Sequence, residues 1–373
     1  IAVLDRDGNV GWAKSFGSTA LDEGWGIAAG SDGSLYVTGE IQGTVDFGGG
    51  PLVPQGYNPF VASFTSDGAY RWAVRFGGDS GTGLVESGFR IAVAGNSDVL
   101  VTGRVEGVVD FGDGMLTSPG SSSSDAFYVR LRGSSGALVH KARSAASGGS
   151  AGFGVAVDAT GNAYLGGTFA GSFSVGAMTY TSRGADDVVI ERVDANDNPL
   201  WVRTFGGTGT DWLFGIGVVG QTVVTVGYYD GMVNLSIPTS KGLKDSFIAT
   251  YALDGTPGWA RGFGGTGCDL MDSAFAGGGE IVVGGVFSGT VDLGDGPHTS
   301  SSASDVLVAT FSTAGTVTSS ATFGGAGDDG AYVTIGDRAT GLYTVSELGM
   351  DLGTDCTAYP AGGQGRIRHL APL

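Results

Sequence analysis

Four aspartates recur at one fixed place in the sequence, and carboxylates repeated in this way could bind a hard cation. Each stands six residues after a phenylalanine that small residues follow, and the four are Asp22, Asp211, Asp269 and Asp329. Ca²⁺ prefers several oxygen ligands, so four carboxylates that the fold brought together would suit it. Alternatively, each Asp accepts hydrogen bonds from its own glycine-rich loop, as Asp commonly does in turns. We favour the second interpretation, because a residue repeated in every unit usually maintains that unit.

Two tryptophans, Trp25 and Trp212, stand close to these acids and are the candidates for binding a partner. An indole ring beside a carboxylate could stack on a sugar or on a side chain of a partner protein. Packing in the core explains either residue equally well. The other four tryptophans recur at the start of one predicted strand, where they should pack between repeats: Trp12, Trp72, Trp201 and Trp259.

Two further sets of repeated positions are rich in Asp, and we expect them to shape turns and strand ends rather than bind ligands. One set lies in segments that resemble GTVDFG and comprises Asp46, Asp110, Asp292 and Asp351. The other set stands before an apolar strand and comprises Asp125, Asp186, Asp245 and Asp305.

The chain offers little for acid–base or nucleophilic catalysis. His140, His298 and His369 have no metal-ligand spacing to one another or to cysteine. No G-x-S-x-G elbow stands between a strand and a helix. We therefore expect no catalytic residue and no required cofactor, with Ca²⁺ as the candidate ion.

Cys268 and Cys356 are expected on the same face of neighbouring repeats. A disulfide between them would fit an oxidising compartment. Two unrelated thiols are the alternative.

These residues are positioned by a cassette that the chain repeats. Its landmark is a phenylalanine followed by small residues, beginning at residues 16, 76, 205, 263 and 323, with a degenerate copy that begins at Ser144. The intervals are 60, 68, 61, 58 and 60. A second landmark keeps step with it, as GTVDFGGG from Gly43, GVVDFGDG from Gly107 and GTVDLGDG from Gly289. A long period built from short apolar runs is typical of propellers and solenoids.

Each cassette reads as four strands. In the fourth cassette they cover residues 214–219, 222–229, 246–253 and 259–263, and Asp254-Gly255 is a tight-turn signal between the last two. No stretch shows a sustained helical period. Four antiparallel strands per repeat predict an all-β fold, a single β-propeller domain over residues 1–373. On that fold the repeated aspartates would approach the mouth of the central channel.

We predict six blades, whose repeats are bounded by residues 17–76, 77–144, 145–205, 206–263, 264–323 and 324–373. Residues 1–16 read as a third and a fourth strand, and residues 12–16 are expected to complete the last blade, which would avoid an open sheet edge. Because residues 1–5 and 366–370 both look like a third strand, seven blades with a missing upstream piece are the alternative.

Composition excludes several classes of protein. The chain has 37 acidic and 19 basic residues and a net charge of −18, and it lacks the basic stripe that nucleic acid or anionic lipid would need. The sequence contains no run of 18 apolar residues, the length that would be needed to span a membrane. Glycine contributes 72 of 373 residues without a three-residue period, which excludes collagen. The first residue is not Met, and the chain reads as a processed segment of an exported protein.

The cassette resembles the bacterial SBBP-type β-propeller repeat over essentially the whole chain. The matching stretches are WVRTFGGTGTD from Trp201, GVAVDATGNAYLGG from Gly154 and DAFYVRL from Asp125. The resemblance implies a propeller in an exported or surface protein and no shared catalytic residue. The third landmark, Ser144-Ala145-Ala146, departs from the pattern, and the fourth cassette lacks the DFG-like segment.

The sequence therefore predicts a non-enzymatic bacterial module, exported or on the cell surface. It would engage a protein or glycan partner through the loop face of the propeller, alone or as a subunit of a larger assembly. The alternative is a carboxylate-based polysaccharide hydrolase or lyase at the channel mouth.

Overall fold

The computed structural model describes residues 1–5, 7, 9–78, 86–117, 124–144, 146–277, 279–301 and 304–324, and three strands beyond them. Every regular element in these ranges is a β-strand. The strands pair in antiparallel order into five four-stranded sheets, one three-stranded sheet and five two-stranded hairpins. The predicted all-β fold, with four antiparallel strands per repeat, is confirmed for this part of the chain.

The five sheets follow one another along the chain, and their strands are added in sequence order. Sheet 1 contains β3 (Asp22–Ala29), β4 (Leu35–Ile41), β7 (Asn58–Phe64) and β8 (Tyr70–Arg75). Sheet 2 contains β9 (Ser87–Val93), β10 (Val99–Val105), β13 (Asp125–Leu131) and β14 (Leu138–Arg143). Sheet 3 contains β15 (Ser150–Val157), β16 (Ala163–Phe169), β19 (Asp187–Val193) and β20 (Pro199–Phe205).

Sheet 4 contains β21 (Trp212–Val219), β22 (Thr222–Tyr229), β23 (Asp245–Ala252) and β24 (Pro257–Phe263). Sheet 5 contains β25 (Leu270–Gly277), β26 (Glu280–Phe287), β29 (Asp305–Phe311) and β30 (Val317–Phe323). The three-stranded sheet contains β31 (Gly330–Ile335), β32 (Tyr343–Leu348) and β33 (Arg366–His369). In sheet 4, β22 begins and ends at the predicted residues, and the other three strands are offset by one or two residues.

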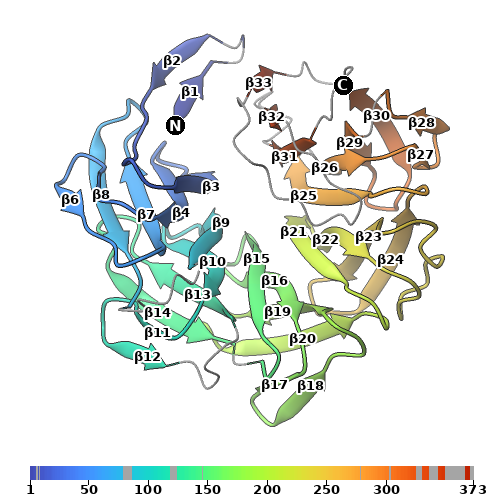
Figure 1. Ribbon diagram of the computed structural model, residues 1–373, viewed down its shortest axis with the longest axis horizontal. Helices are drawn as coiled ribbons and strands as arrows, with labels where there is room; N and C mark the ends of the chain where they lie inside the picture. Colours follow the sequence, from blue (N-terminus) through green and yellow to red (C-terminus); the bar gives the residue numbers. More distant parts are fainter. Residues whose placement is uncertain are drawn as a thin grey trace. The chain divides into compact units, whose positions relative to one another are not determined.

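The chain divides into two compact units. Unit 1 comprises Ile1–Asp5, Asn9–Ser182 and Ile190–Val202, and unit 2 comprises Arg6–Gly8, Arg183–Val189 and Arg203–Leu373. Within unit 1 the first strand of each sheet contacts the first strand of the next, so β3 lies beside β9 and β9 beside β15 (Figure 1). The second strands β4 and β10 also pack on the first strand of the following sheet. Face-to-face packing of successive four-stranded sheets is consistent with propeller blades.

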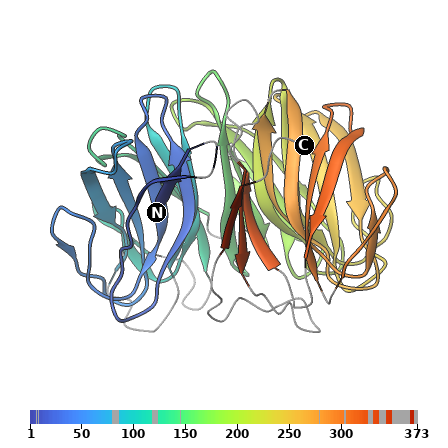
Figure 2. The same ribbon diagram turned by 90° about the horizontal axis from the view of Figure 1, so that it is seen from above.

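Unit 2 repeats this arrangement, because β21 contacts β25 and β25 contacts β31. An apolar cluster lies between sheets 4 and 5 and includes Val226, Ile248, Phe287 and Phe311, all buried. Seen from the side, the strands of each sheet run across the height of its unit, so loops gather at two opposite ends (Figure 2). One end carries the connections between successive sheets and the loops between second and third strands. The other end carries the tight turns.

The N-terminal hairpin packs on sheet 1 as if it were the outer half of a preceding sheet. It consists of β1 (Ala2–Leu4) and β2 (Val10–Ala13), the predicted third and fourth strands. The indole N–H of Trp12 donates to the Ser66 carbonyl oxygen at 2.9 Å, in the turn between β7 and β8. The Trp72 indole makes the same bond, at 2.8 Å, to Gly133 in the corresponding turn of sheet 2. Completion of the last sheet by residues 12–16 stays a prediction.

A β-bulge interrupts each of the five first strands at the same place. In sheet 4, Leu213 pairs with Gly227 and Gly215 pairs with Val226, so Phe214 is the extra residue. The residue opposite the bulge must be glycine, because the two strands lie very close together there. A Cβ atom at Gly227 would lie 1.9 Å from the Trp212 carbonyl oxygen. The extra residue has no partner on the second strand, so the bulge changes the direction of one side chain per sheet. The five bulge residues are Trp25, Phe89, Phe153, Phe214 and Asp272.

Four of the GTVDFG-like segments form small two-stranded hairpins, which lie outside the four strands predicted for each cassette. They are β5 (Val45–Asp46) with β6 (Pro51–Leu52), β11 (Val108–Asp110) with β12 (Met115–Thr117), β17 (Ser172–Val175) with β18 (Met178–Thr181), and β27 (Thr290–Asp292) with β28 (Pro297–Thr299). In three of them an Asp closes the turn. For example, Oδ1 of Asp110 accepts the amides of Gly112 and Gly114 at 2.8 and 3.1 Å.

Candidate functional site

The repeated aspartates of the first motif fasten each sheet's entrance loop to the end of its second strand. In sheet 4, Asp211 accepts the Gly207 amide at 2.7 Å and the Asp230 amide at 3.1 Å. In sheet 5, Asp269 accepts the Gly265 amide at 2.9 Å and the Ser288 amide at 3.1 Å. These are the hydrogen bonds that the turn interpretation predicted.

Asp22 of sheet 1 makes the same kind of bonds, accepting the Ser18 hydroxyl at 2.7 Å and the Gln42 amide at 3.1 Å. Asp329 lies outside the described residues. Desolvation raises the pKa of Asp211 to about 6 and that of Asp269 to about 7. Burial also pushes the pKa of Asp22 upward, but its hydrogen bonds outweigh burial and lower it. Among the described residues no cluster of three metal-ligating side chains occurs, and calcium binding stays a prediction.

The second and third sets of acids hold loops and strand ends. Asp46, Asp110 and Asp292 each accept two glycine amides in their hairpin turns, and Asp351 lies outside the described residues. At the start of the third strands, Asp245 accepts the Lys241 amide at 3.1 Å. In sheet 3 the equivalent residue is Asp187, which accepts the Arg183 amide at 3.1 Å. The prediction of Asp186 was therefore wrong by one residue, because either of the adjacent aspartates fits the sequence pattern.

Trp25 and Trp212 lie in first strands and not in the loops before them. They are also not equivalent. Trp212 opens β21, where its ring stacks on Tyr228 at a centroid distance of 5.9 Å and its N–H donates to Asp186 at 3.2 Å. Trp25 is the bulge residue of sheet 1, and its ring meets Phe89 edge-on at 6.0 Å.

The three bulge residues of unit 1 form a row of aromatic rings across neighbouring first strands. Trp25 contacts Phe89, and Phe89 stacks on Phe153 at 4.9 Å with an angle of 24° between the rings. All three side chains are only half-buried. In unit 2 the bulge residues are Phe214, also half-buried, and the buried Asp272.

Next to this row, polar side chains occupy positions that are aromatic in sheet 4 and apolar in sheet 5. One step from the bulge, Glu23 pairs with Glu40 in sheet 1 and Ser87 pairs with Arg104 in sheet 2. The corresponding pairs are Trp212 with Tyr228 in sheet 4 and Leu270 with Val286 in sheet 5. We call the following residues the sheet 1–2 cluster: Glu23, Trp25, Glu40, Ser87, Phe89 and Arg104.

Several polar atoms of the sheet 1–2 cluster are buried without a hydrogen-bond partner among the described residues. They are Oε2 of Glu40, Oγ of Ser87 and Nε of Arg104. Glu40 is only 3% exposed and Ser87 only 1%. Such atoms are uncommon in folded proteins and each needs an explanation, such as water or a ligand.

The electrostatics of the cluster reflect this burial. Desolvation, followed by the facing charge of Glu23, raises the pKa of Glu40 to about 7, while Arg104 and the Trp25 indole oppose the shift. Burial also raises the pKa of Glu23. Nearby, Glu86 is fully buried, desolvation raises its pKa to about 7, and its Oε2 accepts from Asn58 Nδ2 at 3.1 Å. Glu40 and Glu86 can therefore exchange a proton near neutral pH.

The sequence contained a signal for this cluster that the motif search missed. Aligned on the glycine opposite the bulge, the second strands read GEI, GRV, GTF, GYY and GVF from residues 39, 103, 167, 227 and 285. Only the first two place a charged residue directly after the glycine.

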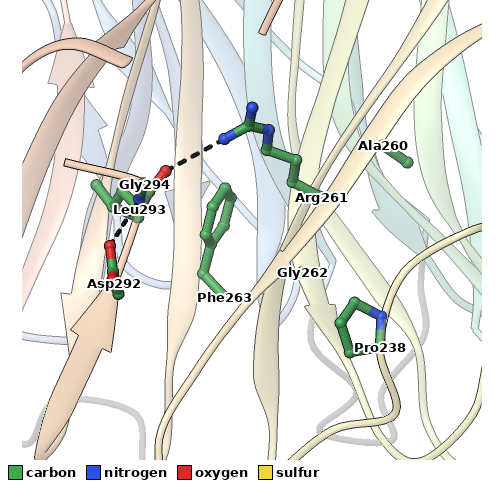
Figure 3. A pocket seen from close by; sticks show the side chains of 8 residues that line it. All are labelled: Pro238, Ala260, Arg261, Gly262, Phe263, Asp292, Leu293 and Gly294. Carbon is green, nitrogen blue, oxygen red and sulfur yellow. Dashed lines mark hydrogen bonds between the residues drawn. The ribbon is translucent and has the colours of Figure 1, made fainter. Parts of the chain in front are cut away.

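An open depression beside β24 has a volume of about 370 Å³ and lies wholly in unit 2 (Figure 3). Its polar groups already have partners. The Arg261 guanidinium donates to the Leu293 carbonyl oxygen at 3.3 Å, and Oδ1 of Asp292 accepts the Gly294 amide at 2.8 Å. We therefore regard the sheet 1–2 cluster, and not this depression, as the candidate site.

Cys268 is 4% exposed and disulfide-bonded. Cys356 lies outside the described residues, so the predicted pairing of these two cysteines stays a prediction. No helix that could cross a membrane occurs in the described part of the chain.

No family model and no curated protein matches the chain. Among solved structures, a luciferin-regenerating enzyme is similar with a TM-score of 0.41 and 11% identity, over 87% of this chain and 83% of that chain. The Dos1 propeller is similar with a TM-score of 0.40 and 8% identity, over 88% and 90% of the two chains. An acylaminoacyl peptidase from Pyrococcus horikoshii has a TM-score of 0.36 and 11% identity, over 93% of this chain and 52% of that chain. The repeated four-stranded sheets themselves, and not these distant similarities, are what make the architecture propeller-like.

Proposed function

We propose that this protein is a non-enzymatic binding module of an exported or cell-surface bacterial protein, and that it engages a protein or glycan partner at the sheet 1–2 cluster. The cluster lies at the end of unit 1 that carries the longer loops, where binding residues on a rigid scaffold are usually found. The proposal rests on one observation. Two neighbouring sheets place charged side chains, the buried Glu40 and the half-buried Glu23 and Arg104, at a repeat position that sheets 4 and 5 fill with apolar or aromatic residues.

Stability alone does not account for those charges. Burying a charged or polar group without a partner costs free energy, and a pair such as Leu270–Val286 fits the same backbone position. Places where a sequence breaks its own local rule are expected at functional sites.

The test is a double variant that gives sheet 1 the pair found in sheet 5, Glu23→Leu with Glu40→Val. We expect this variant to fold with equal or greater stability and to lose the binding that the wild-type protein shows on a glycan array or to a purified surface protein. A matched control, Asp67→Asn with Asp254→Asn, removes two acids from exposed turns at the other loop end. Undiminished binding by the first variant would contradict the proposal.

We also propose that the sheets belong to one six-bladed propeller of the SBBP-repeat type, closed by residues 12–16. The contacts of Trp12 support this idea, because they reproduce those of Trp72. Cysteines introduced at residues 11 and 13, each combined with one in β33, should form a disulfide on oxidation. Mass spectrometry that finds no cross-link in any combination would contradict closure.

The disulfide of Cys268 supports an oxidising compartment.

A second candidate is a carboxylate-based polysaccharide hydrolase or lyase, favoured by the facing carboxyls of Glu23 and Glu40. A Glu with a pKa near neutral could donate a proton in catalysis. Glu40→Gln would then abolish turnover of a polysaccharide while leaving binding measurable. Asp211 is less suitable, because both of its oxygens hold backbone amides. Absence of turnover over a broad panel of polysaccharides would contradict this candidate.

A further inference from the structure

The sheet 1–2 cluster has the charge that a cation would need. Glu23 and Glu40 face each other directly across the β3–β4 ladder, and the whole chain carries a net charge of −18. A negative field attracts cationic ligands and repels phosphates and other anions. A positive group next to Glu40 would supply the donor that its buried Oε2 lacks.

The Trp25 indole adds an apolar ring face beside these carboxyls. Trp25 projects from its bulge, is half-buried, and lies close enough to Glu40 to favour the ionised carboxylate. An indole face can stack on an apolar ring face and can also attract a cation. The ligand therefore combines a ring with a positive charge.

Arg104 adds a third requirement. Its buried Nε–H has no acceptor among the described residues, and Ser87 lies directly across the β9–β10 ladder with its own hydroxyl without a partner. A lysine side chain could satisfy Glu40 but offers no acceptor to Arg104. A sugar that carries an amino group next to hydroxyl groups offers both a charged donor and neutral acceptors.

We propose that the sheet 1–2 cluster binds an amino sugar with a free, protonated amino group, placing the ammonium beside Glu40, a hydroxyl beside Arg104 and the apolar ring face on Trp25. This assignment rests on the proposed binding function and narrows the partner to a cationic glycan.

The probes are three oligosaccharides of equal length with the same linkage, which differ at one position of each sugar. Chitosan oligosaccharide carries the free amine, chitin oligosaccharide carries its neutral N-acetyl form, and cello-oligosaccharide carries a hydroxyl. By calorimetry at pH 7, where Glu40 is partly ionised, we expect the free amine to bind about tenfold or more tightly than the other two, because a charged hydrogen bond is lost in both.

The variants separate the contacts. Glu40→Gln should remove the preference for the amine, Arg104→Met should weaken binding of all three probes, and Trp25→Ala should abolish binding. Asp67→Asn is the control and should leave all affinities unchanged. Thermal unfolding of each variant shows whether it is folded.

Equal affinity for the three probes, an unchanged preference in Glu40→Gln, or no binding of any probe would overturn the amino-sugar assignment. If a neutral oligosaccharide binds and Trp25→Ala abolishes that binding, the proposed function stands and only the assignment fails. If the Glu23→Leu/Glu40→Val variant also retains every interaction of the wild-type protein, both fail.

Discussion

Unit 1 buries charged side chains in two places, and the two places differ in whether those charges are satisfied. Between sheets 2 and 3, the guanidinium of Arg130 donates to Asp197 through Nε, 3.0 Å from each carboxylate oxygen, and through Nη2, 2.7 Å from Oδ1. The Tyr128 hydroxyl is a third donor at 2.7 Å. In the sheet 1–2 cluster, by contrast, Glu40 and Arg104 keep buried atoms without partners. A paired buried charge stabilises the joint between sheets, whereas an unpaired one needs a water molecule or a ligand as its partner.

The Arg130–Asp197 pair replaces a joint that other sheets make with tryptophan. Where Trp72 and Trp259 donate to the turn of the next sheet, the chain has His140 in β14. The turn that receives the contact has changed as well. Asp197 has a φ of 66° at a position that is otherwise glycine with φ between 71° and 85°, at residues 68, 136, 255 and 315.

The largest expected effect is that of breaking the satisfied pair. Arg130→Leu leaves Asp197 buried without its main partner, and we expect it to lower the free energy of unfolding by about 3–5 kcal/mol, measured by urea denaturation. Adding Asp197→Gly, which restores the residue found in the other turns, should recover most of the loss. If the double variant is no more stable than the single one, the buried pair is not what holds this joint.

In the sheet 1–2 cluster we expect a smaller effect, and here the substitution should raise the free energy of unfolding. Because burial raises the pKa of Glu40 to about 7, the folded protein binds an extra proton between about pH 4.5 and pH 7. Stability from this group is therefore greatest at low pH and falls as the pH rises through that window. Glu40→Gln should match the wild-type protein at pH 4 and exceed it by roughly 1–3 kcal/mol at pH 8. If the free energy of unfolding changes with pH in the same way for the two proteins, burial does not disfavour the ionised form of Glu40.

The smallest effects come from the tyrosines at the two kinds of joint. Tyr128→Phe removes a hydrogen bond to a charged acceptor and should cost about 1.5 kcal/mol. Tyr36→Phe removes a bond of 3.2 Å to the Gly133 carbonyl oxygen and the acceptor of a 3.0 Å bond from the half-buried Arg71 guanidinium, and should cost about 1 kcal/mol. Thermal melts of both variants test the ranking. A larger cost for Tyr36→Phe would mean that the polar joint gains nothing from its charge.

Sequence periodicity was sufficient to predict the strands and much of the packing, because residues such as Trp72 and Asp211 recur in most repeats and make the same contacts in the described sheets that contain them. The bulges were not predicted, since the extra residue shows only when two strands are placed in register. The sheet 1–2 cluster was missed for a different reason. Glu40 and Arg104 are departures from the repeat, and a search for recurring residues passes over them.

At the bulge shared by the five sheets, the pairing of the backbone stays the same while the type of the extra residue varies. Trp, Phe and Asp already occupy that place in different sheets without altering the hydrogen-bonded ladders around it. Randomising residues 25, 89, 153, 214 and 272 should therefore yield a family of folded proteins with altered recognition. The scaffold is, in this sense, prepared for diversification by evolution or in the laboratory.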